Sequence, residues 1–204
     1  MSALKLYSFA LSGHAHRARL FISLLGLPAE IIEVDLVNAE HKKPAFLQKN
    51  FFGQVPVLED DNIIIADSNA ILIYLAKTYD RTHTWYPDDL LSQVEIQRFL
   101  TIAAGPVAFG PAAARLVKVF GAKLDYELTV TRAHGILNTL NNYLSNKQWL
   151  VGTTPTIADV ANYSYIAHAP EGGITLADYP NVQAWLKRIE QLPGFIAMQK
   201  TETA

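Results

Sequence analysis

The pattern of apolar and polar positions changes character near residue 80. Before this point, short apolar segments alternate with amphipathic ones, as in strands and helices that build a mixed sheet. The β-α-β start implies parallel strands, whereas the turn at Asp60-Asp61 implies an antiparallel hairpin. The predicted strands cover 4–8, 30–36, 55–59 and 62–66, and the predicted helices cover 14–25, a short piece at 44–48, and 67–78.

The rest of the chain predicts helices alone, over 92–120, 123–145, 156–168 and 181–191. Residues 81–91 hold Pro87 and a polar, acidic run, which is typical of a linker. We therefore expect a small α/β domain over 1–80, a linker over 81–91 and an all-helical domain over 92–204.

Two local patterns refine the helical half. The stretch Phe99–Ala114 carries two Gly-Pro steps, which predict a broken or kinked helix. Thr156 followed by Asp159 fits a capping box, which we interpret as a helix start and nothing more.

Composition excludes several classes of function. Half of the 204 residues are hydrophobic, enough for a core, and the net charge of -2 gives no reason to expect a nucleic-acid partner. The absence of cysteine excludes disulfides, thiolate metal sites, iron–sulfur clusters and a cysteine nucleophile. His14 and His16 lack the spacing and further ligands of a zinc site, so we predict no metal.

The sequence also favours a cytoplasmic protein without a membrane partner. The first twenty residues lack a long apolar core followed by a cleavage site of small residues. The most apolar stretch, Phe99–Ala114, is shorter than the roughly 20 residues that a membrane-spanning helix needs.

The first candidate motif is the loop from Ser8 to His14, between the first predicted strand and helix. It places the Ser12 hydroxyl beside a helix N-terminus, where a partial positive charge favours anions. The alternative is that Ser12 only caps the helix.

The second motif is Asn50–Leu58, in which Pro56 stands at a strand entrance. Proline is normally excluded from central strands, but a cis Val55-Pro56 bond would turn the Val55 backbone outward, toward a peptide ligand. The alternative is an ordinary edge-strand proline.

The third motif is Asp67-Ser68 at the start of a predicted helix. Ser68 and the free N–H groups there suit a carboxylate, and Asp67 suits an ammonium group. The alternative is that one of the two residues simply caps the helix.

In this order and with a helical second half, the motifs resemble the cytosolic glutathione transferase family over essentially the whole chain. The Val-Pro and Asp-Ser pairs are the most specific part, and the Ser-Gly start resembles bacterial, serine-type members similar to the theta and zeta classes. The segments that carry the resemblance are LYS at 6–8, SGHAHRARL at 12–20, LGLP at 25–28, NFFGQVPVL at 50–58, ADSNAILIYLA at 66–76, TIADVANY at 156–163, APEGG at 169–173 and YPNVQAWLKRIEQLPGF at 179–195.

The resemblance implies a thioredoxin-like α/β domain that binds glutathione and an all-α C-terminal domain that supplies the second-substrate pocket. It implies that Ser12 activates the glutathione thiol, with Tyr7, Ser8 or a backbone N–H near His14 as alternatives. It also implies that the Val55 backbone pairs with the cysteinyl part and that Pro56 is the cis proline.

The resemblance further implies that Asp67 and Ser68 hold the γ-glutamyl end, and that Gln54 and His41 reach the glycine carboxylate. Residues expected on the wall of the second-substrate pocket are Phe9, Leu11, Phe99, Ile102, Phe109 and Tyr165, although helical spacing alone also fits core packing.

The function implied is transfer of glutathione to small hydrophobic electrophiles, or glutathione-dependent peroxide reduction, by a homodimer without a cofactor. A thiolate is required because only the ionised form attacks. The alternative function is a non-catalytic binding or stress-response module with the same fold.

Overall fold

The computed structural model describes residues 4–201, which divide into two compact units. Unit 1 holds residues 4–81 together with 193–199, and unit 2 holds 82–192 together with 200–201. The segment 193–199 thus packs with the first unit, whereas the sequence predicts a helical domain over 92–204, of which 202–204 lie outside the described residues.

Unit 1 is a four-stranded mixed sheet with helices, as the sequence predicts. The strand order is β2-β1-β3-β4, with β1 parallel to β2 and antiparallel to β3, and β3 antiparallel to β4. Its elements are β1 (Leu4–Ser8), α1 (Gly13–Leu24), β2 (Ala29–Glu33), α2 (Pro44–Leu47), β3 (Val57–Asp60), β4 (Ile63–Ala66) and α3 (Ser68–Tyr79).

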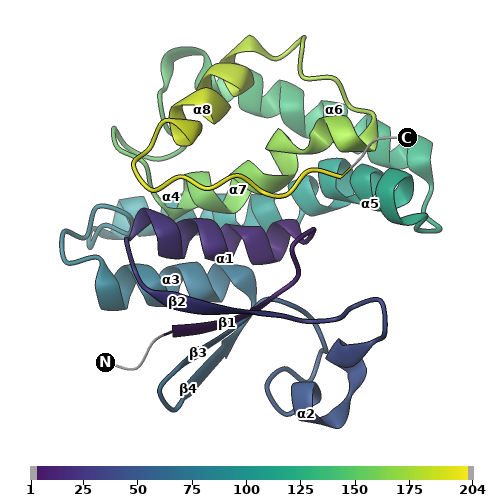
Figure 1. Cartoon of the computed structure of the whole chain (residues 1–204). Helices are drawn as coiled ribbons and strands as arrows, with labels where there is room; N and C mark the ends of the chain where they lie inside the picture. The colour runs from purple at the N-terminus through teal and green to yellow at the C-terminus, as the bar shows by residue number, and fades with distance from the viewer. Residues whose placement is uncertain (1–3, 202–204) are drawn as a thin grey trace. The chain divides into compact units, whose positions relative to one another are not determined.

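Alternation along β1 and β3 gives this sheet two apolar faces. Leu6 lies opposite Leu58 on one face, and both side chains are fully buried. The next pair, Tyr7 and Val57, points to the other face and packs with Phe46 of α2. Helices α1 and α3 lie side by side over the sheet (Figure 1). Their N-termini therefore emerge together at one edge of unit 1.

The segment 193–199 is hydrogen-bonded to α1. The Ser23 hydroxyl donates to the carbonyl oxygen of Gly194 at 2.6 Å, and His16 Nε2 lies 2.9 Å from the Ile196 carbonyl oxygen. Gly194 has φ of 82°, and a Cβ there would lie 2.6 Å from the Ser23 carbonyl oxygen. Glycine is thus required for this close approach.

Unit 2 is all-helical, and its first helical stretch is interrupted as predicted. Helix α4 ends at Ala104, and a π-helical turn over Ala108–Ala112, with Pro111 inside it, leads into α5. Helix α4 begins within the stretch 81–91 that the sequence predicts as a linker. The helices are α4 (Leu90–Ala104), α5 (Ala113–Phe120), α6 (Tyr126–Tyr143), α7 (Ile157–Ala167) and α8 (Pro180–Glu190), labelled in Figure 1.

The predicted capping box at Thr156 and Asp159 is confirmed, and Asp159 has further partners. Its carboxylate accepts hydrogen bonds from the Leu150 backbone N–H at 2.9 Å and the Trp185 indole N–H at 2.8 Å. Burial raises the pKa of Asp159 to about 6, against these hydrogen bonds. The residue thus joins the start of α7 to α8 and to the preceding loop.

The stretch 90–120 is long and apolar enough to cross a membrane by length and composition alone. However, half of its most apolar window is buried within the structure, and Gly105 ends α4 in the middle of the stretch. These features favour a core helix of unit 2.

Candidate active site

Unit 1 contains a cavity of about 940 Å³ at the N-termini of α1 and α3. It is formed by the start of α1, the segment 36–56, the end of β4 and the start of α3. All seven residues predicted for thiol activation and glutathione binding line it: Ser12, His41, Gln54, Val55, Pro56, Asp67 and Ser68. The structure thus collects in one place residues that are up to 56 positions apart in the sequence.

Ser12 is both the N-cap of α1 and part of the cavity wall. Its Oγ accepts a hydrogen bond from the Ala15 backbone N–H at 3.2 Å. A hydroxyl that accepts in this way still has its own proton to donate. The capping role is therefore compatible with donation to a ligand in the cavity.

Asp67 caps α3 in the same way and at a positive φ of 79°. Its Oδ1 accepts hydrogen bonds from the backbone N–H groups of Asn69 and Ala70, both at 2.9 Å. The next residue, Ser68, is 3% exposed and lines the cavity. A carboxylate and a hydroxyl thus stand together at the start of α3.

The loop before β3 is held by its own amide side chain. Asn50 Nδ2 donates to the Gln54 carbonyl oxygen at 2.8 Å, and Asn50 Oδ1 accepts from the Phe52 N–H at 3.1 Å. The Val55-Pro56 bond is cis, as the sequence predicts, and β3 begins at Val57, after the proline. Proline has no N–H for the ladder, which explains why the strand is shorter than the predicted 55–59.

Basic side chains from the segment 36–56 also line the cavity. Lys42 Nζ donates to the Gly53 carbonyl oxygen at 3.0 Å, and Lys49 Nζ donates to Glu59 Oε2 at 2.9 Å. The hydrogen bond to Glu59 raises the pKa of Lys49, so that it stays protonated. Together with the start of α3, the cavity offers cations and an anion to a ligand that carries both charges.

Tyr7, the alternative thiol activator, lies on the sheet face that packs against α2. Its hydroxyl donates to Glu59 Oε2 at 3.1 Å, and Lys49 Nζ lies 4.7 Å from the centre of its ring. Hydrogen bonds from Lys49 and then Lys5 hold the pKa of Glu59 at about 2, so the acceptor of the Tyr7 hydroxyl is charged. These contacts favour a packing role for Tyr7.

The six residues expected on the second-substrate pocket are spread over several environments. Phe9 and Leu11 precede Ser12 in the loop between β1 and α1 and are partly buried. Phe99 and Tyr165 are only 2% and 8% exposed. The Phe99 ring packs edge-on against Tyr143, so the helical spacing of this residue reflects core packing.

Ile102 and Phe109 line a groove of about 880 Å³ in unit 2, between the end of α4 and α6. Phe109 is 59% exposed. The groove is lined mainly by apolar groups, with Arg132 as its cation.

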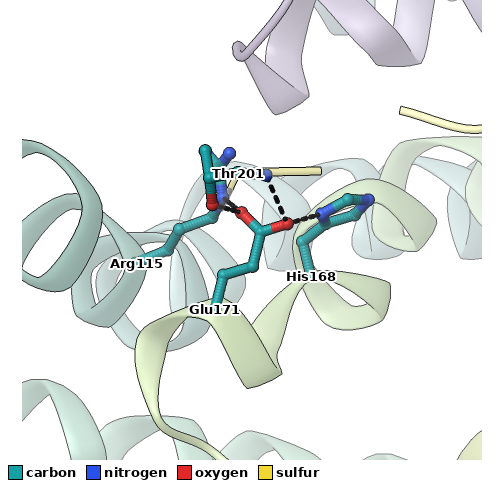
Figure 2. Close-up of polar contacts among 4 residues, drawn as sticks. All are labelled: Arg115, His168, Glu171 and Thr201. Atoms are coloured by element: carbon teal, nitrogen blue, oxygen red, sulfur yellow. Dashed lines mark hydrogen bonds and ion pairs between the residues drawn. The ribbon is translucent and has the colours of Figure 1, made fainter. Parts of the chain in front are cut away.

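A buried ionic cluster in unit 2 has no counterpart among the predicted site residues (Figure 2). The Glu171 carboxylate accepts from Arg115 Nε at 2.7 Å and from the Thr201 hydroxyl at 2.6 Å, and it lies 2.7 Å from His168 Nδ1. Burial opposes the negative charge, but the hydrogen bonds from Thr201, Arg115 and His168 outweigh it and hold the pKa of Glu171 at about 2. The cluster ties the turn after α7 to α5 and to Thr201.

Sequence reasoning missed several residues on the wall of the unit 1 cavity. Asn50 opens the motif NFFGQVPVL, where an amide side chain three positions before a glycine was the available signal of a turn. Lys42 and Lys49 gave only a local excess of positive charge, which is common on solvated surfaces. The missed residues on the wall include His14, Lys42, Lys49 and Asn50.

Comparison with known proteins agrees with this geometry. Residues 2–77 match the family model described as Glutathione S-transferase, N-terminal domain, and residues 106–193 match Glutathione S-transferase, C-terminal domain. The chain belongs to the glutathione S-transferase family. The sequence-based recognition of the family and its fold is thus confirmed, and the protein is classed as a glutathione transferase.

Individual relatives of this glutathione S-transferase agree with the classification. Human glutathione S-transferase theta-2 is 30% identical over 200 residues, which cover 94% of this chain and 82% of that protein. A glutathione S-transferase structure from Pseudomonas fluorescens has a TM-score of 0.91 and 31% identity, and covers 98% of this chain and 100% of its own. A glutathione transferase homologue from Drosophila mojavensis, solved with bound glutathione, has a TM-score of 0.84, 29% identity and coverage of 95% and 90%.

Proposed function

We propose that the unit 1 cavity binds glutathione and that Ser12 activates its thiol for attack on small hydrophobic electrophiles. The observation that carries the proposal is that all seven residues assigned from the sequence line one cavity. The family membership and the glutathione bound to the Drosophila homologue support the same ligand.

In the proposed complex, Asp67 pairs with the γ-glutamyl ammonium group and Ser68 donates to the γ-glutamyl carboxylate. The Val55 backbone pairs with the cysteinyl part, and Pro56 shapes the chain at that point. Gln54 and His41 contact the glycine carboxylate, and Lys42 and Lys49 add positive charge on the same wall. A tripeptide with one cationic and two anionic ends suits this distribution.

In the proposed chemistry, the protein stabilises the thiolate form of bound glutathione. A free thiol with a pKa of about 8.5 is mostly protonated at neutral pH, and only the thiolate attacks. The Ser12 hydroxyl donates a hydrogen bond to the sulfur, which favours the charged form, and the N-terminus of α1 adds to this effect. The thiol proton leaves to solvent, the sulfur forms a bond to the electrophilic carbon, and the leaving group departs with its electron pair.

Phe9 and Leu11 are proposed to contact the electrophile, because they come just before Ser12 in the same loop. Reduction of peroxides by two glutathione molecules, which yields glutathione disulfide, an alcohol and water, is the second activity of the same thiolate. The protein is proposed to act in the cytoplasm as a homodimer.

The test is retention on immobilised glutathione, followed by assays with a panel of electrophiles and an organic hydroperoxide. We expect retention, elution by free glutathione, and conjugation of at least one electrophile. Retention without turnover of any substrate would instead favour the non-catalytic binding module.

A further inference from the structure

A buried arginine stands behind Ser68, and the predicted site does not include it. Arg17 lies in the second turn of α1, is 1% exposed, and reaches across to the start of α3. Its Nη1 donates to Ser68 Oγ at 2.9 Å and to Asn69 Oδ1 at 2.8 Å. All three residues belong to unit 1.

These bonds fix the direction of the Ser68 hydroxyl. A guanidinium group carries only donors, so Ser68 Oγ must accept in its bond with Arg17. The hydroxyl proton is therefore directed to another acceptor. The structure offers His14 Nδ1 at 3.4 Å, which is a long contact, and the cavity that Ser68 lines.

His14 does not compete with Arg17 as a source of positive charge. Burial, and next the charge of Arg17, lower the pKa of His14 to about 3, so that this ring is neutral at physiological pH. Arg17 adds a full positive charge to the partial positive charge of the N-terminus of α3.

We propose that Arg17 is a positioning residue that turns the Ser68 hydroxyl proton toward the γ-glutamyl carboxylate of glutathione and attracts this carboxylate by its charge. The inference rests on the proposed function, because it takes glutathione as the ligand of the cavity. Arg17 acts through Ser68 and has no part in the step at the sulfur.

The test compares two peptides on the wild-type protein and on Arg17→Gln. The first is glutathione, and the second is its analogue in which hydrogen replaces the γ-glutamyl α-carboxylate. We expect the wild type to prefer glutathione, and Arg17→Gln to lose about ten-fold or more of this preference while its affinity for the analogue is unchanged. The matched control is Arg19→Gln, the same change on the same helix, which should keep the preference.

The ratio of the two affinities distinguishes a positioning role of Arg17 from a purely structural one, because a loosened fold would weaken the binding of both peptides alike. Arg17→Lys keeps the charge but loses the forked geometry, so its affinity ratio should lie between those of the wild type and Arg17→Gln. If Arg17→Gln does not fold, Arg17→Lys alone provides the test. The inference would be overturned if Arg17→Lys keeps the affinity ratio of the wild type and Arg17→Gln, where it folds, keeps it too. If the wild type binds neither peptide, the proposed function itself fails.

Discussion

At the scale of single residues, two helix caps also line the unit 1 cavity. Ser12 and Asp67 each accept hydrogen bonds from backbone N–H groups at a helix start, and each also lines the cavity. In sequence the capping and ligand roles look like alternatives, because both require the same residue types at the same position. The geometry makes them compatible.

Two substitutions at Asp67 distinguish its role as the N-cap of α3 from the role of its negative charge in ligand binding. Asp67→Asn keeps an N-cap side chain that tolerates positive φ, so we expect little change in stability. It removes the negative charge, so glutathione affinity should fall. Asp67→Ala should reduce both, with a stability cost of about 1 kcal/mol from the lost cap. Urea unfolding and a glutathione titration measure the two effects; equal destabilisation by both variants would contradict this division.

At the scale of elements, the close approach of the π-helical turn to α6 depends on Gly110. A Cβ at Gly110 would lie 2.8 Å from the Ala133 backbone nitrogen, which cannot move aside as a side chain can. On α6 itself, Gly135 has open space where its Cβ would be. Packing thus requires glycine at position 110 and does not require it at position 135.

Substitution by alanine should therefore change the stability of the protein in opposite directions at these two positions. Gly110→Ala should destabilise the protein by about 1–3 kcal/mol through overpacking. Gly135→Ala should stabilise it by up to about 1 kcal/mol, because alanine is the better helix former. Thermal unfolding of both variants tests this, and a neutral Gly110→Ala would show that the turn does not pack closely on α6.

The buried Glu171 cluster should make stability depend on acidity. The pKa of Glu171 is about 2 in the fold, against an ordinary value of 4.5. Its contribution, on the order of 3 kcal/mol, is thus fully present above pH 4.5 and is lost as the pH falls toward about 2. Glutamine cannot ionise, so the stability difference between wild type and Glu171→Gln should be largest at neutral pH and shrink below pH 4.5.

Urea unfolding at several pH values measures this difference. The exposed Glu127→Gln serves as the matched control and should change stability little at any pH. A Glu171→Gln difference that stays constant from pH 7 to pH 3 would rule out the ionic contribution.

Local patterns in the sequence predict every strand and most helices to within a few residues, because hydrophobic period and helix signals are local. They also predict the capping box at Thr156, whereas the cis Val55-Pro56 bond follows from the family resemblance, because the local pattern left an ordinary edge-strand proline open. They do not reveal the Arg17 contact with Ser68, since 51 positions separate the two and their meeting depends on how α1 and α3 pack. Nor do local patterns reveal that Phe99 is a core residue, because core and pocket positions share one helical spacing.

At the scale of the whole molecule, more than half of the exposed large apolar side chains come from one segment of unit 2. Among residues 4–201, eight of the fourteen large apolar side chains that are exposed lie between residues 90 and 128. The groove with Ile102 and Phe109 belongs to the same part. These exposed apolar side chains are available for contact with a second copy of the chain, as the proposed homodimer requires.

The dimer is tested by light scattering at micromolar concentration. We expect a particle of twice the chain mass of 22.6 kDa. Phe109→Glu places a charge on the exposed apolar surface and should shift the mass toward the monomer, whereas Val37→Glu, an exposed position in unit 1, should not. A wild-type particle of 22.6 kDa would contradict the proposal.

The most direct test of Ser12 as the thiol-activating residue is the ultraviolet titration of the glutathione thiolate bound to the wild type and to Ser12→Ala. Loss of a hydrogen bond to a charged sulfur should raise the midpoint by about one to two pH units and lower the rate at neutral pH about ten-fold or more. Tyr7→Phe, the matched removal of a hydroxyl, should leave the midpoint in place. An unchanged midpoint in Ser12→Ala would contradict the assignment of Ser12 and leave it only the role of a helix cap.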